Sequence, residues 1–314
     1  MMTIHTPMLP HQSDTLFLTD GGLETWLVFQ KGIELREFAA FELLATKEGR
    51  AALREYFVPF LRMAEESQAG FVLDTPTWRA NPDWAAKLGL SAKDVAEVNR
   101  NAVAFADALR WDAPNGDAIL INGVIGPRGD GYDPGMLMTP KEAEEYHTLQ
   151  VDTLAHTRAD MLSAVTMTNA PEAIGIARAA GEADIPCVVS FTVETDGTLP
   201  SGQALADAIA ETDGSGPARP AYYMINCAHP DHFRAMLEEA GDWRDRIQGV
   251  RANASRMSHA ELDQAEELDD GNPAELGHLC TDLTRLLPRL NVFGGCCGTD
   301  HRHIHQMSDA FRGV

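Results

Sequence analysis

The stretch Asn291-Val292-Phe293-Gly294-Gly295-Cys296-Cys297-Gly298-Thr299 is the most informative part of the chain. A short apolar run that stops at paired glycines and continues into two adjacent cysteines is typical of a strand whose carboxyl end carries both thiols onto a tight turn. A second apolar run, Ala221-Tyr222-Tyr223-Met224-Ile225-Asn226-Cys227, also ends on a cysteine. If both runs are parallel strands of one sheet, Cys227, Cys296 and Cys297 converge at the same edge. Three sulfurs with an open fourth position are the ligand set of a catalytic zinc site.

Burial in the core is the competing interpretation of these cysteines, because cysteine is among the most buried residue types and is often inert. The glycines around the pair, Gly294, Gly295 and Gly298, favour a backbone that wraps around a metal, since packing alone does not require them. Spacing alone leaves metal binding and packing both open. We assign Cys187, within an apolar strand, and Cys280, within a helical stretch, to packing.

The composition limits the possible classes of function. The chain has 314 residues, 44% of them hydrophobic and 23% charged, which suits a globular protein with one large domain or two modest ones. Its 25 basic and 47 acidic side chains give a net charge of -22. Because such a surface repels phosphate backbones and anionic lipids, we expect no binding to nucleic acid or to membrane surfaces.

We expect neither a signal sequence nor a membrane span. Residues 1–14 lack a basic region followed by an apolar stretch, and no later segment offers about eighteen uninterrupted apolar residues. A cytoplasmic protein is therefore expected. In that reducing compartment the five cysteines are interpreted as free thiols or metal ligands and not as a disulfide scaffold.

Short apolar runs alternate with helical segments along the whole chain. The runs cover residues 16–19, 70–75, 118–125, 161–166, 186–193, 221–227, 248–253 and 291–295, and the main helical segments 46–68, 82–109 with an interruption near Gly89, 140–159 and 169–181. This alternation predicts one domain, residues 1–314, folded as a closed (β/α)8 TIM barrel after a lead-in of residues 1–14. In such barrels the chemistry lies at the carboxyl ends of the strands. Asp20, Asp74, Cys227 and the Cys296-Cys297 pair all follow strand ends.

Several motifs resemble those of the homocysteine S-methyltransferase family. They are Thr19-Asp20-Gly21-Gly22, Gly126-Pro127, Ser190-Phe191-Thr192 with Asp196-Gly197 and Gly202, Asn226-Cys227, and Gly294-Gly295-Cys296-Cys297-Gly298-Thr299 with His303-Ile304. The similarity extends from about residue 15 to residue 307. Its most specific part is the doubled glycine, the doubled cysteine and the following Gly-Thr.

The resemblance implies a zinc-dependent barrel that transfers a methyl group from a cationic or folate donor to the sulfur of homocysteine, which gives methionine. The zinc ligands that it implies are Cys227, Cys296 and Cys297. It also implies that Asp20 holds the ammonium group of the substrate and that the backbone amides of Gly21 and Gly22 hold its carboxylate.

One position departs from the family pattern. In many members the fourth strand ends in Glu-Thr, and the glutamate gives the amino group of the substrate a second anchor; the equivalent pair here is Val165-Thr166. Loss of a charged acceptor from an ammonium site costs about 1.5–3 kcal/mol unless another group replaces it. Either Asp20 or another acid such as Glu194 compensates, or the acceptor is a thiol other than homocysteine. Thr166 and Glu194 are accordingly candidate substrate-binding residues.

Aromatic residues after the first three strands are candidates for holding the methyl donor. A sulfonium or quaternary ammonium group favours aromatic faces, and Trp26, Trp78 and Tyr132 all follow strand ends. The alternative is that these rings only cap the barrel. Arg79 would lie at the same mouth, where a surface ion pair with a nearby acid is the favoured role; the further hypothesis is that it pairs with a donor carboxylate, as in a betaine or a sulfoniopropionate.

The histidines near the cysteines are not expected to bind metal. His301, His303 and His305 follow the cysteine pair, but we expect them at the start of the last helix, where an i, i+2 spacing does not put side chains on one face. For His229 and His232, which follow Cys227 closely, a capping or surface role is expected.

The leading hypothesis is a zinc-dependent S-methyltransferase with two small-molecule partners. These are homocysteine as the thiol acceptor and a small onium donor of the S-methylmethionine, betaine or sulfoniopropionate type; a folate donor is less favoured, because no second barrel or cobalamin-binding region follows. One alternative is zinc-dependent hydrolysis, although three thiolates make the zinc less acidic and no general base is evident. Another is non-catalytic binding of a thiol or methylated osmolyte, with Val165 marking lost catalysis. The number of subunits is not predicted.

Overall fold

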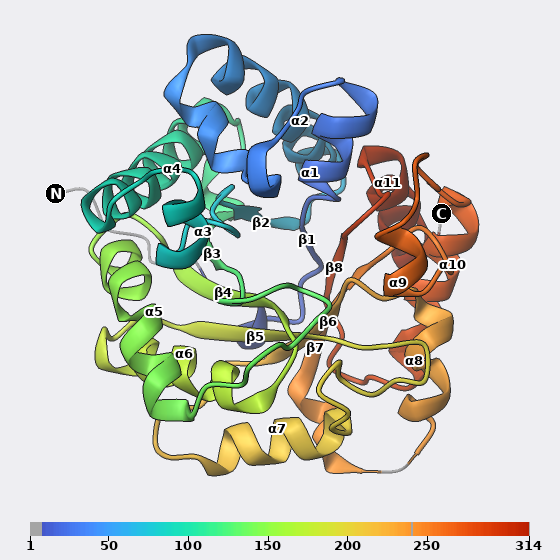
Figure 1. The fold of residues 1–314 in the computed structure, drawn as a ribbon. Coiled ribbons are helices and arrows are strands. Elements are labelled where there is room, and N and C mark those ends of the chain that lie inside the picture. Colours follow the sequence, from blue (N-terminus) through green and yellow to red (C-terminus); the bar gives the residue numbers. More distant parts are fainter. Residues whose placement is uncertain (1–7, 240, 314) are drawn as a thin grey trace, which may run out of the picture.

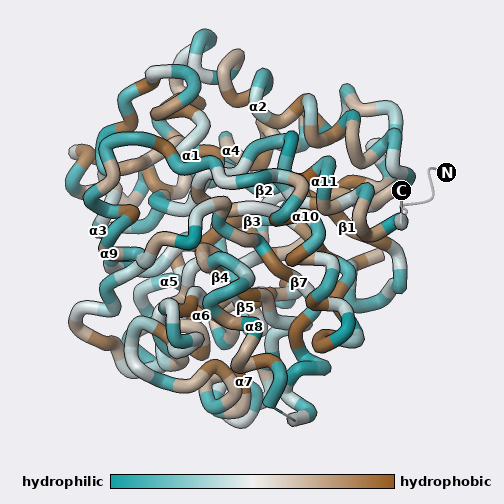
Figure 2. The backbone as a smooth tube through the Cα atoms, turned by 90° about the vertical axis from the view of Figure 1, so that its right-hand side faces the viewer, coloured by the Kyte–Doolittle hydropathy of each residue, from teal (hydrophilic) through white to brown (hydrophobic). Residues whose placement is uncertain are grey.

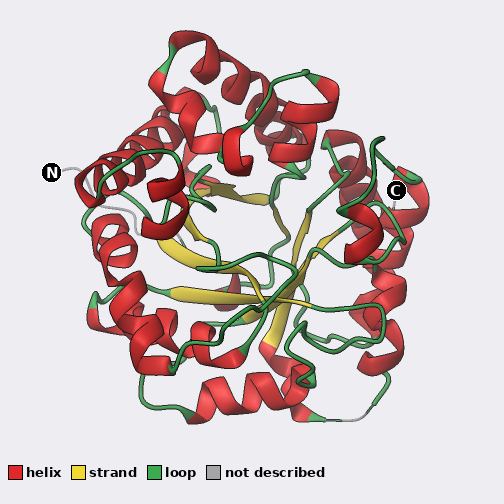
Figure 3. Ribbon diagram, in the orientation of Figure 1, coloured by secondary structure: helices red, strands yellow, loops and turns green. Residues whose placement is uncertain are grey.

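A closed barrel of parallel strands forms the centre of the molecule, and helices surround it (Figures 1 and 3). The computed structural model describes residues 8–239 and 241–313. The eight strands pair in chain order, and the first closes on the last, with Phe17 opposite Val292 and Leu18 opposite Phe293. The prediction of a single (β/α)8 TIM barrel is confirmed. Residues 1–7 of the expected lead-in lie outside the described residues.

The strands lie close to the apolar runs of the sequence. They are β1 (Phe17–Leu18), β2 (Gly70–Asp74), β3 (Ile119–Ile125), β4 (Met161–Met167), β5 (Cys187–Thr192), β6 (Tyr223–Asn226), β7 (Ile247–Ala252) and β8 (Val292–Gly295). The helices are α1 (Leu23–Thr25), α2 (Lys47–Glu66), α3 (Pro82–Lys87), α4 (Ala92–Asp112), α5 (Pro140–Ala155), α6 (Ala170–Glu182), α7 (Leu205–Gly214), α8 (Pro230–Leu237), α9 (His259–Leu262), α10 (Pro273–Asp282) and α11 (His301–Arg312).

Two helical segments differ from the prediction. The segment 82–109 is divided into α3 and α4, because Gly89 adopts a left-handed turn with φ of 78° between them. Helix α5 ends at Ala155 and not near residue 159. Asp160 is engaged instead by β3, where its amide donates to the carbonyl oxygen of Ile121 at 2.8 Å and its carboxylate accepts from the Ile121 amide at 2.7 Å.

The outer helices bury one face each. Along them, hydrophilic and hydrophobic segments alternate (Figure 2), as expected of helices that pack on a sheet. Helix α2 buries Leu53, Phe57, Phe60 and Ala64, which lie at helical spacing. Within the described residues, no helix combines the length and the apolar character that crossing a membrane requires.

Apolar side chains fill the interior of the barrel near the amino ends of the strands. In β2, Leu73 packs into the large core under the helices, whereas its neighbour Val72 belongs to a separate apolar cluster. Since strand side chains point alternately to opposite faces, this second cluster lies inside the barrel. Its members include Phe17, Leu120, Met161, Val188, Met224 and Val292. Leu9 belongs to the same cluster and is 8% exposed, so the segment before β1 closes this end of the barrel and is more than a lead-in.

The next interior layer, toward the carboxyl ends of the strands, is polar. Its residues include Asp74, Asn122, Ser163, Ser190 and Asn226, and all are buried. Asn122 Nδ2 donates to Asp74 at 2.7 Å, and the Ser163 hydroxyl donates to Asn122 Oδ1 at 3.0 Å. Buried polar groups are costly unless they find hydrogen-bond partners. This network therefore fixes the side chains of the polar layer, which lies directly below the mouth of the barrel.

The glycines of the cysteine loop permit close packing. A Cβ atom at Gly294 would lie 2.0 Å from the hydroxyl oxygen of Thr19, and one at Gly295 would lie 1.9 Å from the hydroxyl oxygen of Thr299. Gly298 has φ of 78°, which favours glycine. Contacts with β1 and with the loop itself therefore explain these residues, and wrapping of a metal is not needed to explain them.

Asp300 begins α11 and carries a charge that folding stabilises. Its carboxylate accepts hydrogen bonds from the amide of Arg302 at 2.9 Å, from the Arg302 guanidinium at 2.8 Å and from Gln30 at 3.2 Å. Burial alone would raise the pKa of Asp300, but these bonds and that of His303 hold it well below its ordinary value. A carboxyl whose pKa is lowered by folding stabilises the protein above its unfolded pKa and loses that contribution as pH falls.

Asp300→Asn, which can still cap the helix, is therefore expected to be roughly 1.5–3 kcal/mol less stable than the native protein near neutral pH. The difference should shrink as pH falls through the unfolded value of 3.8. Urea unfolding of both proteins at several pH values measures this. A difference that stays constant across the acidic range would contradict the assigned charge.

Candidate metal and substrate site

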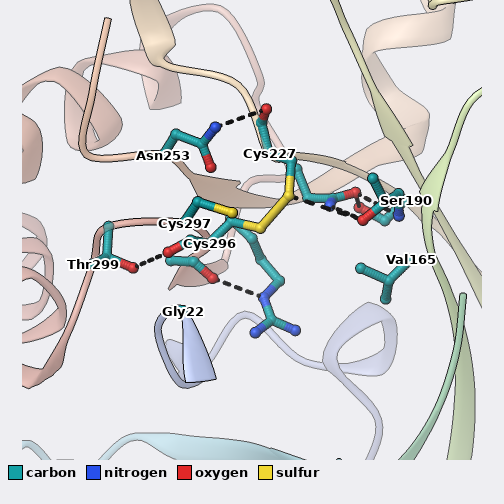
Figure 4. Close-up of a disulfide and its surroundings, with 12 residues drawn as sticks. Gly22, Val165, Ser190, Cys227, Asn253, Cys296, Cys297 and Thr299 are labelled. Atoms are coloured by element: carbon teal, nitrogen blue, oxygen red, sulfur yellow. Dashed lines mark hydrogen bonds between the residues drawn. A yellow bond between two sulfur atoms is a disulfide. The ribbon is translucent and has the colours of Figure 1, made fainter. Parts of the chain in front are cut away.

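The sulfur atoms of Cys227, Cys296 and Cys297 lie within 4.8 Å of one another at the carboxyl ends of β6 and β8 (Figure 4). The predicted convergence is therefore present. Cys227 and Cys296 are joined as a disulfide, with Cα atoms 5.3 Å apart, whereas Cys297 is a free thiol. The sequence predicted free thiols or metal ligands, so the structure differs from this prediction at Cys227 and Cys296 and agrees with it at Cys297. In the part of the chain that is described, this is the one group of three or more Cys, His, Asp or Glu side chains close enough to share a metal ion.

Hydrogen bonds with the end of β7 and the residue after it position Cys227, which follows β6, and Cys296, which follows β8. The amide of Cys227 donates to the carbonyl oxygen of Arg251 at 3.1 Å, and that of Cys296 donates to the carbonyl oxygen of Ala252 at 2.8 Å. The carbonyl oxygen of Cys227 accepts from Asn253 Nδ2 at 3.0 Å (Figure 4). Cys227 has φ of 54°, a conformation that is unfavourable for a residue other than glycine. These bonds therefore maintain the backbone that turns its sulfur toward the pair.

Thr166 of β4 and Asn226 of β6 support Cys227. The register of β4 with β5 shifts between Ala164 and Met167, and Thr166 in this bulge has φ of 64°. Asn226 Oδ1 accepts from the Thr166 amide at 3.0 Å, and Asn226 Nδ2 donates to the Thr166 hydroxyl at 2.8 Å. The Thr166 hydroxyl oxygen lies 3.9 Å from Cys227 Sγ. Because that oxygen already accepts from Asn226, its proton can be donated to the sulfur.

A pocket of about 400 Å³ opens onto the sulfur atoms. Seven residues that the sequence suggested for binding the substrates line it, namely Asp20, Gly21, Gly22, Trp78, Arg79, Tyr132 and Thr166. Trp26 and Glu194 are not among the described residues that line it. The ring of Trp26 packs instead against Tyr56, with centroids 5.3 Å apart.

The loop between β3 and α5 crosses the mouth of the barrel (Figure 1), and its Tyr132 contacts His259 of α9. The Tyr132 ring stacks on His259 with centroids 3.9 Å apart, and its hydroxyl lies 3.5 Å from Cys297 Sγ. His259 was not identified from the sequence. Its ring nitrogens lie 3.0 Å from a carboxylate oxygen of Glu194 and 2.7 Å from the carbonyl oxygen of Cys227. In this arrangement Glu194 orients His259. Glu194 is linked to the sulfur cluster only indirectly, through the contacts of the His259 ring.

Arg251 lies between two acids that the sequence singled out, Asp20 and Asp74. Its guanidinium bonds one oxygen of Asp20 at 2.6 Å and also pairs with Asp74, and each of the three side chains is at most 9% exposed. The other oxygen of Asp20 accepts from the Tyr56 hydroxyl at 3.1 Å, and that of Asp74 accepts from Asn122. Burial raises the pKa of Asp20 to about 7 against the opposing charge of Arg251. All four carboxylate oxygens thus already accept a hydrogen bond from the protein.

Gly21 and Gly22 bring the turn after β1 against the cysteine loop. A Cβ atom at Gly21 would lie 2.6 Å from the carbonyl oxygen of Thr299, and one at Gly22 would lie 2.4 Å from that of Cys296. The Gly22 amide donates to the Thr299 carbonyl oxygen at 3.0 Å. Of the two amides expected to bind a carboxylate, that of Gly21 has no hydrogen-bond acceptor among the described residues.

Arg79 is a buried cation in the wall of the pocket. Its guanidinium lies between the rings of Trp78 and Trp84, 4.0 and 3.6 Å from their centroids, and donates to the carbonyl oxygen of Gly129 at 3.1 Å. It also pairs with Asp130 at 3.5 Å, but its side chain is only 7% exposed, so this is not the surface ion pair that the sequence suggested. Burial lowers the pKa of Arg79. Its Nε is buried without a hydrogen-bond partner among the described residues.

The neighbouring histidines have structural roles. His303 lies in the first turn of α11, where its Nδ1 lies 3.2 Å from a carboxylate oxygen of Asp300. His229 begins α8, and its ring accepts from the amide of Asp231 at 3.2 Å. The predicted capping role of His229 is confirmed, and neither histidine belongs to the sulfur group.

The same fold occurs in the homocysteine methyltransferase MmuM from Escherichia coli, at 20% sequence identity. Its oxidised form superposes with a TM-score of 0.74, covering 95% of this chain and 97% of that chain. The metallated form gives a TM-score of 0.71 with 96% and 97% covered, and the apo form 0.65 with 97% of each, both at the same 20% identity. At this level of identity the likeness shows the fold.

The sequence pattern of a known family covers the same region. The model described as homocysteine S-methyltransferase matches residues 17–311, a range that contains every strand of the barrel and all three clustered cysteines. The chain therefore belongs to the homocysteine S-methyltransferase family and is a methyltransferase.

Proposed function

We propose that the protein is a zinc-dependent enzyme that transfers a methyl group from a small onium donor to the thiol of homocysteine and forms methionine. The observation that carries this proposal is the convergence of three sulfur atoms on one pocket. Membership of the family supports methyl transfer to homocysteine. The sulfur cluster supports zinc, and the lining of the pocket supports the class of donor.

The residues present fit a zinc ion. Three cysteine sulfurs leave a fourth position for a ligand from outside the protein, and soft sulfur donors disfavour magnesium or calcium. Cys227 and Cys296 can serve as ligands only as separate thiolates, so the disulfide between them must be reduced before metal binds. When bound, zinc would keep the sulfur of the acceptor deprotonated at neutral pH.

Hydrogen-bond donors from the chain surround the sulfur cluster. The Thr166 hydroxyl lies 3.9 Å from Cys227 Sγ, and the Tyr132 hydroxyl lies 3.5 Å from Cys297 Sγ. Burial, together with the charge of Cys297, raises the pKa of Tyr132 well above its ordinary value, so its phenol keeps the proton that it donates. Such bonds to ligand atoms orient them and moderate their charge. The loop that carries Tyr132 also covers the pocket, which excludes water and holds the reactants together.

Arg79 is the residue that we propose for binding the carboxylate of the donor. It lines the pocket, and its buried Nε has no partner among the described residues. Its pair with Asp130 is loose at 3.5 Å, so a carboxylate from solution could compete for the guanidinium. Because Arg79 covers one face of Trp78, only the rest of that ring is available to an onium group.

The experiment is a donor panel. Reduced, zinc-loaded protein is incubated with homocysteine and S-methylmethionine, a betaine, a sulfoniopropionate or trimethylsulfonium, and methionine is measured by mass spectrometry. We expect methionine with a donor that carries a carboxylate and much slower formation with trimethylsulfonium, which has none. Homocysteine binding without methionine from any donor would favour a sensor. Cleavage of esters or amides in place of methyl transfer would favour a hydrolase.

Metal loading is expected to depend on reduction. Protein treated with a thiol reductant should bind one zinc ion per chain, because three thiolates are then available. Protein oxidised before exposure to zinc should bind little, because the Cys227–Cys296 disulfide removes two of the three donors. Metal analysis after gel filtration measures both states, and equal loading would contradict the site. This dependence also underlies our proposal of a cytoplasmic location, where thiols stay reduced.

A further inference from the structure

Glu24 is an acid in the pocket that neither the sequence motifs nor the fold account for. It lies in α1, directly after the Asp20-Gly21-Gly22 turn, and its half-buried side chain lines the pocket together with Cys297. Among the described residues, its carboxylate makes no hydrogen bond or ion pair with another side chain, and its own backbone amide is its one hydrogen-bond donor.

The other acids of the pocket are engaged or exposed. Both oxygens of Asp20 accept from Arg251 and Tyr56, and Asp74 is bonded by Arg251 and Asn122. The remaining lining acids lie at the rim and are exposed, namely Asp130, Asp263, Glu267 and Asp269, and Asp130 also pairs with Arg79. Glu24 is therefore the acid inside the described pocket whose oxygens are free to accept new hydrogen bonds.

The surroundings of Glu24 do not favour its charge. Burial raises the pKa of Glu24 to about 7, although the positive charges of Arg79 and Arg251 oppose this. A half-buried carboxylate that lacks a partner costs the fold free energy. Groups of this kind are found at functional sites, where a ligand supplies the missing partner.

We propose that Glu24 binds the ammonium group of homocysteine and so takes the role that a glutamate at the position of Val165 has in many members of the family. This inference rests on the proposed function, since it assumes homocysteine as the acceptor. Val165 lines the same pocket but offers only an apolar side chain. Glu24 from α1 and Val165 from β4 therefore line one pocket, and of the two only Glu24 brings a carboxylate to it.

The chemistry of the two substrates favours the acceptor over the donor as the partner of Glu24. An ammonium group carries three N–H donors, which match the unoccupied oxygens of a carboxylate. The onium centre of a methyl donor is fully alkylated and has no hydrogen to donate. In homocysteine, three carbon atoms separate the ammonium nitrogen from the sulfur, and Glu24 and Cys297 line the same pocket. Both ends of the acceptor thus find partners in one pocket.

The test compares two thiols on the reduced, zinc-loaded protein. L-homocysteine and 4-mercaptobutyrate differ only in the amino group, so the difference in their affinities isolates the ammonium site. We expect Glu24→Gln to weaken homocysteine binding by about 10–100-fold, as for the loss of a charged hydrogen bond. The affinity for 4-mercaptobutyrate should change by less than about twofold. Titration calorimetry measures all four constants without reference to turnover.

Two controls separate this role from a structural one. Glu24→Gln should keep or raise the melting temperature, because it removes an unfavourable buried charge; a lower melting temperature with both thiols weakened equally would overturn the proposal. Glu267→Gln removes an exposed acid at the rim. If this variant loses as much homocysteine affinity as Glu24→Gln, the overall negative charge of the pocket explains the binding, and the proposal is overturned as well.

The inference and the proposed function fail in different ways. If Glu24→Gln binds homocysteine like the native protein and methionine still forms, the inference is wrong and the proposed function stands. If the native protein binds 4-mercaptobutyrate as tightly as homocysteine, it has no ammonium site and the inference is wrong as well. If the native protein binds neither thiol, both fall.

Discussion

Cys296→Ser is expected to abolish metal binding and to lower the rate of methionine formation by about a thousandfold or more. Changes to groups that only support metal ligands already cost about 10–100-fold, and this substitution removes a ligand itself. Serine is a poor zinc ligand because its hydroxyl stays protonated near neutral pH. Metal content by mass spectrometry and methionine formation under saturating substrates measure the two effects.

Cys280→Ala provides the matched control for Cys296→Ser. Cys280 is a cysteine of the apolar core and lies outside the sulfur group. We expect this variant to keep its metal and its activity. Activity retained by Cys296→Ser, with or without metal, would show that the sulfur cluster is not the catalytic centre.

Arg251→Met is expected to lower the free energy of unfolding by about 3–5 kcal/mol, the cost of leaving buried acids without their counter-charge. It removes the guanidinium that holds both Asp20 and Asp74. The loss should depend on pH, because without Arg251 the pKa of Asp20 would rise further above its present value of about 7. An acid whose pKa is raised by folding destabilises the folded state as pH rises above its unfolded value of 3.8. The deficit should therefore be smaller in mild acid than in mild alkali.

Arg246→Met is the comparison for Arg251→Met. Arg246 also forms a short ion pair, with Asp213 at 2.7 Å, but the two side chains are 31% and 20% exposed. Water can replace part of that pair, so we expect a clearly smaller loss with little dependence on pH. Urea unfolding of the two variants at several pH values gives the comparison. We call Asp20, Asp74 and Arg251 the Arg251 cluster. Equal losses would show that this buried cluster contributes no more to the free energy of unfolding than a partly exposed ion pair does.

The barrel and the sulfur cluster could be predicted because their signals are local. Each strand is an apolar run, and Cys227 and the Cys296-Cys297 pair stand at the ends of two of them. Parallel strands place their carboxyl ends together, so convergence follows from the fold class. The disulfide could not be predicted in this way, since the same proximity serves either a bond between two sulfurs or a shared metal.

The Arg251 cluster was missed because its members belong to three different strand regions of the chain. Asp20, Asp74 and Arg251 meet only when the barrel closes, and no spacing in the sequence links them. A weak signal was present, since an arginine inside an apolar strand must find acidic partners if it is buried. The interior asparagines and serines gave a similar signal, as polar residues at alternate positions of otherwise apolar runs.

Glu24 was missed for a different reason, because its position in the sequence looks ordinary. In the sequence it is an acid in the first turn of a helix, where acids are common because they suit the helix dipole. Nothing in the motif separates that ordinary role from binding. Only the structure distinguishes Glu24 from Asp20. Among the described residues, no side chain donates a hydrogen bond to Glu24, whereas Arg251 and Tyr56 donate to the two oxygens of Asp20.

X-ray absorption at the zinc edge tests most directly whether three sulfurs hold a metal and leave one position for the acceptor. For the reduced, zinc-loaded protein we predict three sulfur neighbours at about 2.3 Å and one lighter atom at about 2.0–2.1 Å. Addition of homocysteine should replace the lighter atom with a fourth sulfur. A shell without sulfur, or one with four sulfurs before any thiol is added, would contradict the account.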